Sequence, residues 1–273
     1  MALASLEIYK ILPGTNCGDC GHPTCLSFVN DLVFRGEKPA RCPHLNRASQ
    51  QKIEDLVRKG SPRNLQSYGQ VMFHPLETAI KRVQPLNFSY LSAVMGEGTT
   101  YLSDEVAIRM PFLNSHLHVT KTRVASEDLT PLPPGFQTAV FNYLATVAKI
   151  HPENRWVSFK ELPGAVFLSS YFTNNVEGLV AGQFASRIDR LLQASVSLGG
   201  EVLTDPGISP ADVKVSFFVV PKVTVRLLFW DRTEEDNLPA VATFLFDAGI
   251  YRLDLESLTH LIEELVKRLV ATL

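Results

Sequence analysis

The sequence predicts an α+β protein in two parts. A small helical N-terminal domain covers residues 1–63, and a larger α+β domain with a mainly antiparallel sheet covers residues 76–273. Three observations lead to this prediction. All four cysteines lie within the first 42 of the 273 residues. Residues 61–75 (SPRNLQSYGQVMFHP) carry chain breakers and weak periodicity, which is typical of a linker. Beyond them, strand and helix patterns come in separate runs, which favours the α+β class.

Composition narrows the classes of protein to consider. The chain is 45% hydrophobic and long enough to bury a sizeable core. With 26 basic and 28 acidic residues, the chain lacks the surplus of positive charge that an extended electrostatic interface with nucleic acid needs. We therefore expect no nucleic-acid partner. The first apolar run is broken by Glu7, Lys10 and Pro13, so no signal peptide is predicted, and no stretch is long enough for a membrane span. We therefore expect a cytoplasmic protein with reduced thiols, in which four cysteines favour a metal or redox site over disulfides.

Two helices are predicted in the N-terminal domain. The run TCLSFVNDLVFRG places Cys25, Phe28 and Val29 at helical spacing and stops at Gly36. A second helix is expected over about residues 46–59. Basic residues outnumber acidic ones from 1 to 63, and the reverse holds in the rest of the chain.

The first half of the larger domain is expected to start with strands. FSYLSAV (88–94) and YLSDEVAIRM (101–110) are interpreted as strands around a turn at Gly96-Glu97-Gly98, and NSHLHVT (114–120) as a third strand. Residues 136–150 then show helical spacing after a segment rich in proline.

The second half is expected to contain a long helix, a meander and a final helix. The long helix covers about residues 176–198 and ends at Gly199-Gly200, which suits a left-handed cap. VKVSFFVV (213–220) and VTVRLLFW (223–230) are interpreted as a hairpin, extended by AVATFLFD (240–247). An amphipathic helix from about 255 to 270 closes the chain.

The cysteines follow the spacing C-x2-C-x4-C-x16-C. Cys17, Cys20 and Cys25 share one loop. A predicted helix between Cys25 and Cys42 returns the chain to this loop, and Pro43 follows Cys42. A four-iron cluster needs four thiolates around a broad inorganic body, and one loop plus one distant ligand can enclose it. Glycines at 14, 18 and 21 let the backbone curl and aim N–H groups at sulfur. Cys25 also lies near a predicted helix start, where unpaired N–H groups favour an anion.

Three other interpretations of the cysteines stay open at this point. A structural zinc ion is the strongest, although such sites usually use two closely spaced cysteine pairs. Two disulfides fit poorly with a reducing compartment. A CxxC redox pair lacks a strand-to-helix setting and leaves Cys25 and Cys42 unexplained.

The segment LPGTNCGDCGHPTCLSFVNDLVFRGEKPARCP resembles the small four-iron module of the corrinoid iron–sulfur protein large subunit and of the B subunit of Rnf-type electron-transport complexes. The family pattern is matched by Leu12 through Cys25 and by Cys42-Pro43, within about the first 60 residues. The resemblance implies that Cys17, Cys20, Cys25 and Cys42 bind one [4Fe–4S] cluster that passes single electrons.

The larger domain has a second resemblance. WVSFKELPGAVF (156–167), Gly199-Gly200 and the segment 219–247 resemble domain-of-unknown-function family 3786, which is found beside iron–sulfur modules in anaerobes. This resemblance implies no chemistry. The cobalamin-binding barrel of the corrinoid protein is not expected here, because the required alternation of strands and helices is absent from the sequence.

Several residues of the larger domain are secondary candidates, each with a plainer structural role as the favoured interpretation. His116 and His118 would lie on one side of a strand as metal or haem ligands, or be simply hydrogen-bonded. Trp156 and Trp230 would stack on a flat cofactor, or pack in the core. An acidic loop with Asp231, Glu234, Glu235 and Asp236 would bind a cation or a basic partner, or be simply solvated. Asp247 would be a ligand or cap a turn. Met95–Gly98 would be part of a phosphate loop or a hairpin turn.

The leading hypothesis is a [4Fe–4S] protein that transfers one electron to or from a redox partner protein, a low-potential electron carrier, or a cofactor held by the larger domain. Lys38, Arg41 and Arg47 near Cys42 would meet an acidic partner or the acidic larger domain. One alternative is a reductive enzyme or a protein that binds a corrinoid or other tetrapyrrole, with a pocket lined by Trp156, Trp230 and His118. Another is a purely structural cluster.

Overall fold

The computed structural model describes residues 7–22, 24–34, 37–60, 75–205, 210–232 and 238–272. Contacts divide the chain into two compact units, each described by itself below. Unit 1 extends to His74 and also includes Val166–Asn175. Unit 2 contains Pro75–Ala165 and Val176–Leu273. The predicted linker lies almost entirely outside the described residues, since only its last residue is described, and that residue begins a helix.

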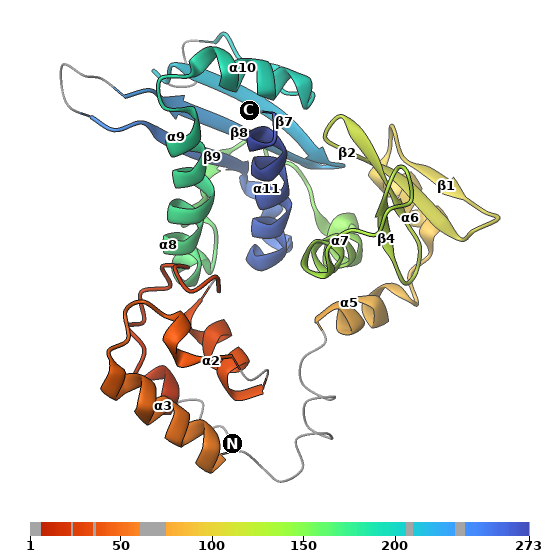
Figure 1. The fold of residues 1–273 in the computed structure, drawn as a ribbon. Helices are drawn as coiled ribbons and strands as arrows, with labels where there is room; N and C mark the ends of the chain where they lie inside the picture. The colour runs from red at the N-terminus through yellow and green to blue at the C-terminus, as the bar shows by residue number, and fades with distance from the viewer. Residues whose placement is uncertain are drawn as a thin grey trace. The chain divides into compact units, whose positions relative to one another are not determined.

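Unit 1 is helical. Helix α2 (Cys25–Phe34) and helix α3 (Arg47–Gly60) match the two predicted helices (Figure 1). Thr24 and Ser27 cap α2 reciprocally, because each backbone N–H donates to the other hydroxyl, at 3.1 and 3.0 Å. Phe28, Val29 and Leu32 of α2 are buried together with Ile53 of α3. The helix α8 (Ser169–Phe172) comes from much later in the chain.

Unit 2 contains two antiparallel sheets. The first has the order β1-β2-β3-β4, and Arg109 pairs with His118 in its register. Its strands are β1 (Thr100–Leu102), β2 (Ala107–Phe112), β3 (Ser115–Val119) and β4 (Val124–Ser126). The backbone N–H of Leu113, after β2, donates to Val219 O of the second sheet at 3.0 Å.

The second sheet has the order β5-β9-β8-β7-β6, so the predicted meander forms its centre. Its strands are β5 (Trp156–Ser158), β6 (Glu201–Val202), β7 (Val213–Val220), β8 (Val223–Trp230) and β9 (Val241–Asp247). Alternate residues of β7 and β8, such as Val215, Phe217 and Leu227, are fully buried. The sheet therefore has one face turned to a core.

Helices pack on these sheets and on one another. They are α5 (Pro75–Val83), α6 (Phe88–Met95), α7 (Pro134–Thr146), α9 (Gly178–Phe184), α10 (Ile188–Ser197) and α11 (Leu255–Val270). Helices α9, α10 and α11 contact the second sheet, and α7 lies between α5 and α11 (Figure 1). The apolar face of α11, which its amphipathic sequence predicts, is buried, and Asp254 caps the first turn of this helix. Among the described helices, none has the length and apolarity that crossing a membrane requires.

The prediction of a strand over 88–94 is wrong, because this segment is helix α6. Asn87 caps it by accepting the Tyr90 N–H at 3.0 Å, and Gly96 ends it with φ 82°. Phe88, Leu91 and Met95 are buried, at the spacing of one helix face. The short aromatic run favoured a strand, but capping and burial on one face decide for a helix. The turn at Gly96–Gly98 accordingly joins a helix to β1, and not two strands.

Two further expectations are corrected. The predicted strand 101–110 is a hairpin of β1 and β2, since the chain turns where Val106 adopts φ 50°. The predicted helix 176–198 is broken into α9 and α10. Ser186 adopts φ 58° between them, and its N–H donates to Asp231 Oδ1 at 2.7 Å. The cap after α10 is confirmed, with Gly199 at φ 80°. Helix α5 and the short strands β4, β5 and β6 were not predicted.

Candidate metal centre

The loop before α2 carries three of the four cysteines in a tightly curled backbone. Gly14, Gly18 and Gly21 have φ of 68°, 84° and 81°, as a curled loop requires. Asn16 shares this conformation with φ 50°, and its Oδ1 accepts the N–H of Cys25 at 2.8 Å. The loop is thereby fastened to the first residue of α2, and Cys25 lies at a helix N-terminus as predicted.

The fourth cysteine is returned to this loop by a short 3-10 helix, Pro39–Arg41. The N–H of Cys42 donates to Pro39 O at 3.2 Å, and Cys42 O accepts the N–H of Leu45 at 3.3 Å. Both sides of Cys42 are therefore held by backbone hydrogen bonds.

The cysteines lie in an apolar setting. Cys20, Cys25 and Cys42 are buried in one cluster with Leu12 and Phe28, whereas Cys17 is half-buried. All four are free thiols, so the disulfide interpretation has no support.

The four thiols are close enough to influence one another. Burial raises the pKa of the Cys20 and Cys42 thiols. The backbone N–H groups of His22 and His44 point at these two sulfurs and act in the opposite direction, while neighbouring cysteines raise both pKa values further. A deprotonated thiolate here needs a positive partner, which metal ions supply.

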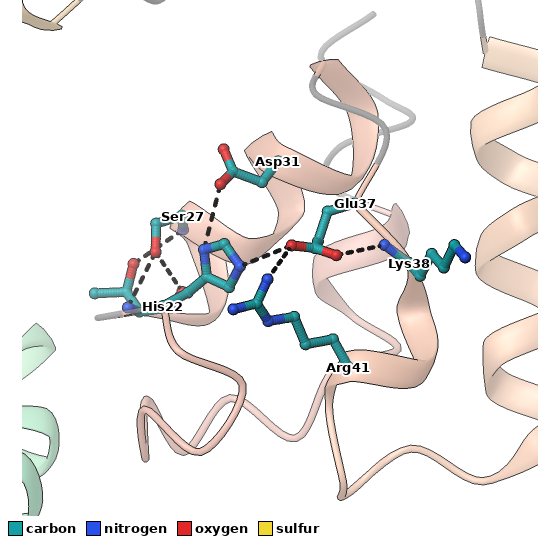
Figure 2. A network of polar contacts seen from close by, with 7 residues as sticks. His22, Ser27, Asp31, Glu37, Lys38 and Arg41 are labelled. Carbon is teal, nitrogen blue, oxygen red and sulfur yellow. Dashed lines mark hydrogen bonds and ion pairs between the residues drawn. The ribbon is translucent and has the colours of Figure 1, made fainter.

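A polar network fastens the loop that follows Cys20 (Figure 2). The His22 ring lies between two carboxylates, with Nδ1 3.4 Å from Asp31 Oδ2 and Nε2 3.7 Å from Glu37 Oε2. Arg41 Nη1 donates to Glu37 Oε2 at 2.7 Å. The pKa of Glu37 is lowered, first by the N–H of Lys38 and then by Arg41. The network ties the α2 side of the site to the chain that leads to Cys42.

A second polar group, which the sequence analysis does not predict, lies beside Cys17. Cys17 Sγ, a carboxylate oxygen of Asp19 and a ring nitrogen of His44 all lie within 4.8 Å of one another. His44 Nε2 is 2.6 Å from Asp19 Oδ2. The pKa of Asp19 is lowered by the hydrogen bond with His44 and next by that with Cys17. The proximity of His44 to Cys42-Pro43 in sequence was the available signal.

The residues present fit an iron–sulfur group. The donor set is four thiols, backbone N–H groups point at the sulfurs of Cys20 and Cys42, and three glycines with positive φ let the loop curl. Among the described residues, no three cysteine sulfurs lie within 4.8 Å of one another.

The two strand histidines have the plainer of their predicted roles. His116 Nδ1 is 2.9 Å from Arg109 Nη2, and His118 Nε2 is 2.8 Å from Glu105 Oε2. Both lie on the same, less buried side of β3, but with separate polar partners.

Trp156 and Asp231 have partners within the described part of the larger domain. Trp156 is stacked under the Arg226 guanidinium, 3.9 Å from ring centre to Cζ. Trp230 lies on β8 of the second sheet, whereas His118 lies on β3 of the first. Asp231 accepts backbone N–H groups of Ser186 and Arg232. Glu234, Glu235 and Asp236 are outside the described residues.

Asp247 has the capping role, one of the two roles that the sequence predicts for it. Its carboxylate accepts the N–H groups of Glu153, Asn154 and Gly249 at 2.7–2.8 Å. It therefore closes the end of β9.

An open, polar pocket of about 450 Å³ lies at the start of α10. It is lined by Ser186, Arg187, Ile188, Asp189, Arg190, Gln193 and Asp231. None of the residues predicted to line a tetrapyrrole pocket contributes to it.

Two family profiles match the chain. The family described as "Putative Fe-S cluster" matches residues 12–44, and the family described as "Domain of unknown function (DUF3786)" matches residues 93–268. The first match spans all four cysteines, and the second spans most of unit 2.

The curated relatives match over a short stretch. The acetyl-CoA decarbonylase/synthase complex subunit gamma of Methanopyrus kandleri is 42% identical over 55 residues, 20% of this chain and 12% of the relative. The gamma 2 subunit of Methanosarcina thermophila is 44% identical over 59 residues, 21% of this chain and 13% of the relative. The corrinoid/iron-sulfur protein large subunit of Moorella thermoacetica is 43% identical over 54 residues, 20% of this chain and 12% of the relative. The chain thus spans only about an eighth of the length of these relatives. No solved structure matches.

Proposed function

The chain belongs to the DUF3786 family, and on that premise we propose that it is an electron-transfer protein with one [4Fe–4S] cluster bound by Cys17, Cys20, Cys25 and Cys42. The observation that carries the proposal is the convergence of four free thiols in one mostly apolar site, with backbone N–H groups aimed at the sulfurs of Cys20 and Cys42. Such N–H groups favour the charged form of sulfur and are common around iron–sulfur clusters.

The thiolates, the backbone N–H groups and the apolar side chains of the site have separate roles in this proposal. The four thiolates hold the group, which when bound supplies one-electron chemistry. The N–H groups of His22 and His44 disperse negative charge at Cys20 and Cys42. The apolar side chains of Leu12 and Phe28 keep water from the buried side.

The partner is proposed to be an acidic redox protein. Lys38 and Arg47 are exposed on the chain that flanks Cys42. Arg41, the third predicted docking residue, is instead paired with Glu37 and belongs to the network around His22. Two exposed cations near one cluster ligand suit an acidic partner surface. The relatives that match the cysteine segment are subunits of complexes by name, which agrees with a protein partner.

Metal analysis after anoxic purification tests the cluster. We expect four irons and four sulfides per chain and an EPR signal that appears on one-electron reduction and disappears on reoxidation. Cys42→Ser should lose most of the iron. One zinc and no colour would contradict the proposal. Iron that cannot be cycled without unfolding would support a structural cluster, and bound cobalt would support the corrinoid alternative.

Charge reversal tests the docking. The full chain with Lys38→Glu and Arg47→Glu should accept electrons more slowly from a small acidic ferredoxin, and the rate should depend less on salt. Lys149→Glu, an exposed reversal in unit 2, serves as the matched control and should leave the rate unchanged. Equal rates and equal salt dependence for both variants would remove the docking proposal while leaving the cluster assignment intact.

A further inference from the structure

A segment from the middle of the DUF3786 match contributes to unit 1. Val166–Asn175 lies within the matched residues 93–268, yet it forms one compact unit with the cysteine domain. The segment includes α8 and the start of a π-helical turn, Thr173–Glu177. Such turns are rare and frequently occur at functional sites.

The contact is made at the one cysteine that is not fully buried. Asn175 Nδ2 donates to the backbone carbonyl of Cys17 at 2.9 Å and also to Tyr171 O at 3.1 Å. The same amide group therefore fixes both the cysteine loop and the preceding helical turn.

Gly18 shows how closely the segment lies on the loop. A Cβ at Gly18 would be 2.4 Å from Asn175 Nδ2 and 2.6 Å from Tyr171 Cδ2. A side chain there is excluded by these two residues as well as by the φ of 84°. Tyr171 and Asn175 thus cover the backbone of Cys17-Gly18.

We propose that Asn175 and Tyr171 are positioning residues of the cluster site, through which the DUF3786 part of the chain sets the reduction potential and the lability of the cluster. This inference rests on the proposed function. A hydrogen-bond donor on the Cys17 carbonyl withdraws negative charge from the peptide next to a ligating sulfur and holds its orientation. The arrangement also gives a physical reason for the presence of both modules on one chain.

Substitution of Asn175 in the full chain tests the proposal. In Asn175→Ala the midpoint potential, measured by EPR-monitored titration, should shift to more negative values because a donor is lost. Iron loss to a chelator should become roughly tenfold faster, the scale usual for the second shell of a metal site. Asn175→Asp keeps the shape, places a carboxylate against the carbonyl, and should shift the potential further in the same direction.

Asn174→Ala is the matched control, because Asn174 is exposed on the same helical turn. It should behave as the unmodified protein in both measurements. If the unmodified protein holds a reducible cluster and both Asn175 variants match the Asn174 control, this inference is overturned and the proposed function stands. If the unmodified protein holds no iron, the proposed function itself fails. Variants that bind no iron would be compared in circular dichroism, where a native spectrum supports a role in cluster retention and an unfolded one contradicts a specific positioning role.

Discussion

One buried carboxylate, that of Asp247, holds the end of β9. It accepts three backbone N–H groups, and Gly249 lies so close to His151 O that a Cβ would be 1.9 Å from it. Asp247→Ala leaves these donors without their acceptor. We expect the free energy of unfolding to fall by about 3 kcal/mol, measured by urea denaturation, because each buried donor left without a partner costs about 1–3 kcal/mol.

Two further variants separate this effect from a general loss of charge. Asp247→Asn keeps one acceptor oxygen and should lose less stability than Asp247→Ala. Glu97→Ala removes an exposed carboxylate from a turn and should change stability by less than about 0.5 kcal/mol. A similar small loss for all three variants would show that Asp247 is not a structural anchor.

His260 gives unit 2 a predicted pH dependence. Burial opposes its protonation, but the hydrogen bond with Glu263 and the charges of Glu263 and Glu256 outweigh burial and raise the pKa of His260. A histidine whose pKa is higher in the folded state stabilises the fold below its unfolded pKa of 6.5, and this contribution is lost as the pH rises through the folded value. The melting-temperature difference between the unmodified protein and His260→Gln should therefore shrink from pH 5.5 to pH 8.5. A difference that stays constant over this range would refute the linkage.

At the scale of single residues, the sequence predicts the four proposed cluster ligands but not the residues that hydrogen-bond to them. Cys17, Cys20, Cys25 and Cys42 stand out by their spacing, because metal ligands of one residue type leave a local pattern. Asn175 leaves none, since its bond to Cys17 joins residues 158 positions apart. Asp247 was open to two interpretations, and only its three backbone partners decide between them.

At the scale of elements, two glycines in neighbouring parts of unit 2 should respond in opposite ways to alanine. A Cβ at Gly200, between α10 and β6, would lie 2.7 Å from Phe217, Val215 and Ser195 O. Overpacking of this kind costs about 1–3 kcal/mol. Gly182 in α9 is exposed and has open space around its Cα, so alanine there should stabilise the helix by about 0.5–1 kcal/mol. Urea denaturation of the two single variants checks both signs, and a loss of stability in Gly182→Ala would contradict the role of α9 as a regular helix.

Elements with one clear periodicity are predicted well, and elements decided by caps and breaks are not. Helix α11 and the strands β7, β8 and β9 form over the segments that their patterns predict. Helix α6 mixes aromatic and small side chains in eight residues, which favours a strand, and its Asn87 cap is the signal that distinguishes it. The break between α9 and α10 depends on Asp231, which accepts the Ser186 N–H from 45 residues away.

At the scale of the whole molecule, the two units differ in how they are stabilised. The core of unit 1 is small, and three of its buried members are Cys20, Cys25 and Cys42. Unit 2 has an extensive core of its own, with Phe217, Phe244 and other aromatic side chains buried completely. Small domains of the first kind depend on a metal or disulfides for stability, because their apolar area alone does not offset the loss of chain entropy.

Removal of iron should therefore unfold unit 1 and spare unit 2. We expect hydrogen–deuterium exchange, followed by mass spectrometry on the chelated and the iron-loaded full chain, to show lost protection in the described residues between 7 and 60 and, separately in sequence, in 166–175. Protection should persist in the described residues of 75–165 and 176–272, since no cysteine lies there. The loss at 166–175 is the discriminating result, because these residues follow unit 1 only if their contact with Cys17 and Gly18 is part of its fold. Protection that persists at 166–175 after chelation would assign this segment to unit 2, and an even loss along the chain would make the two units one cooperative structure.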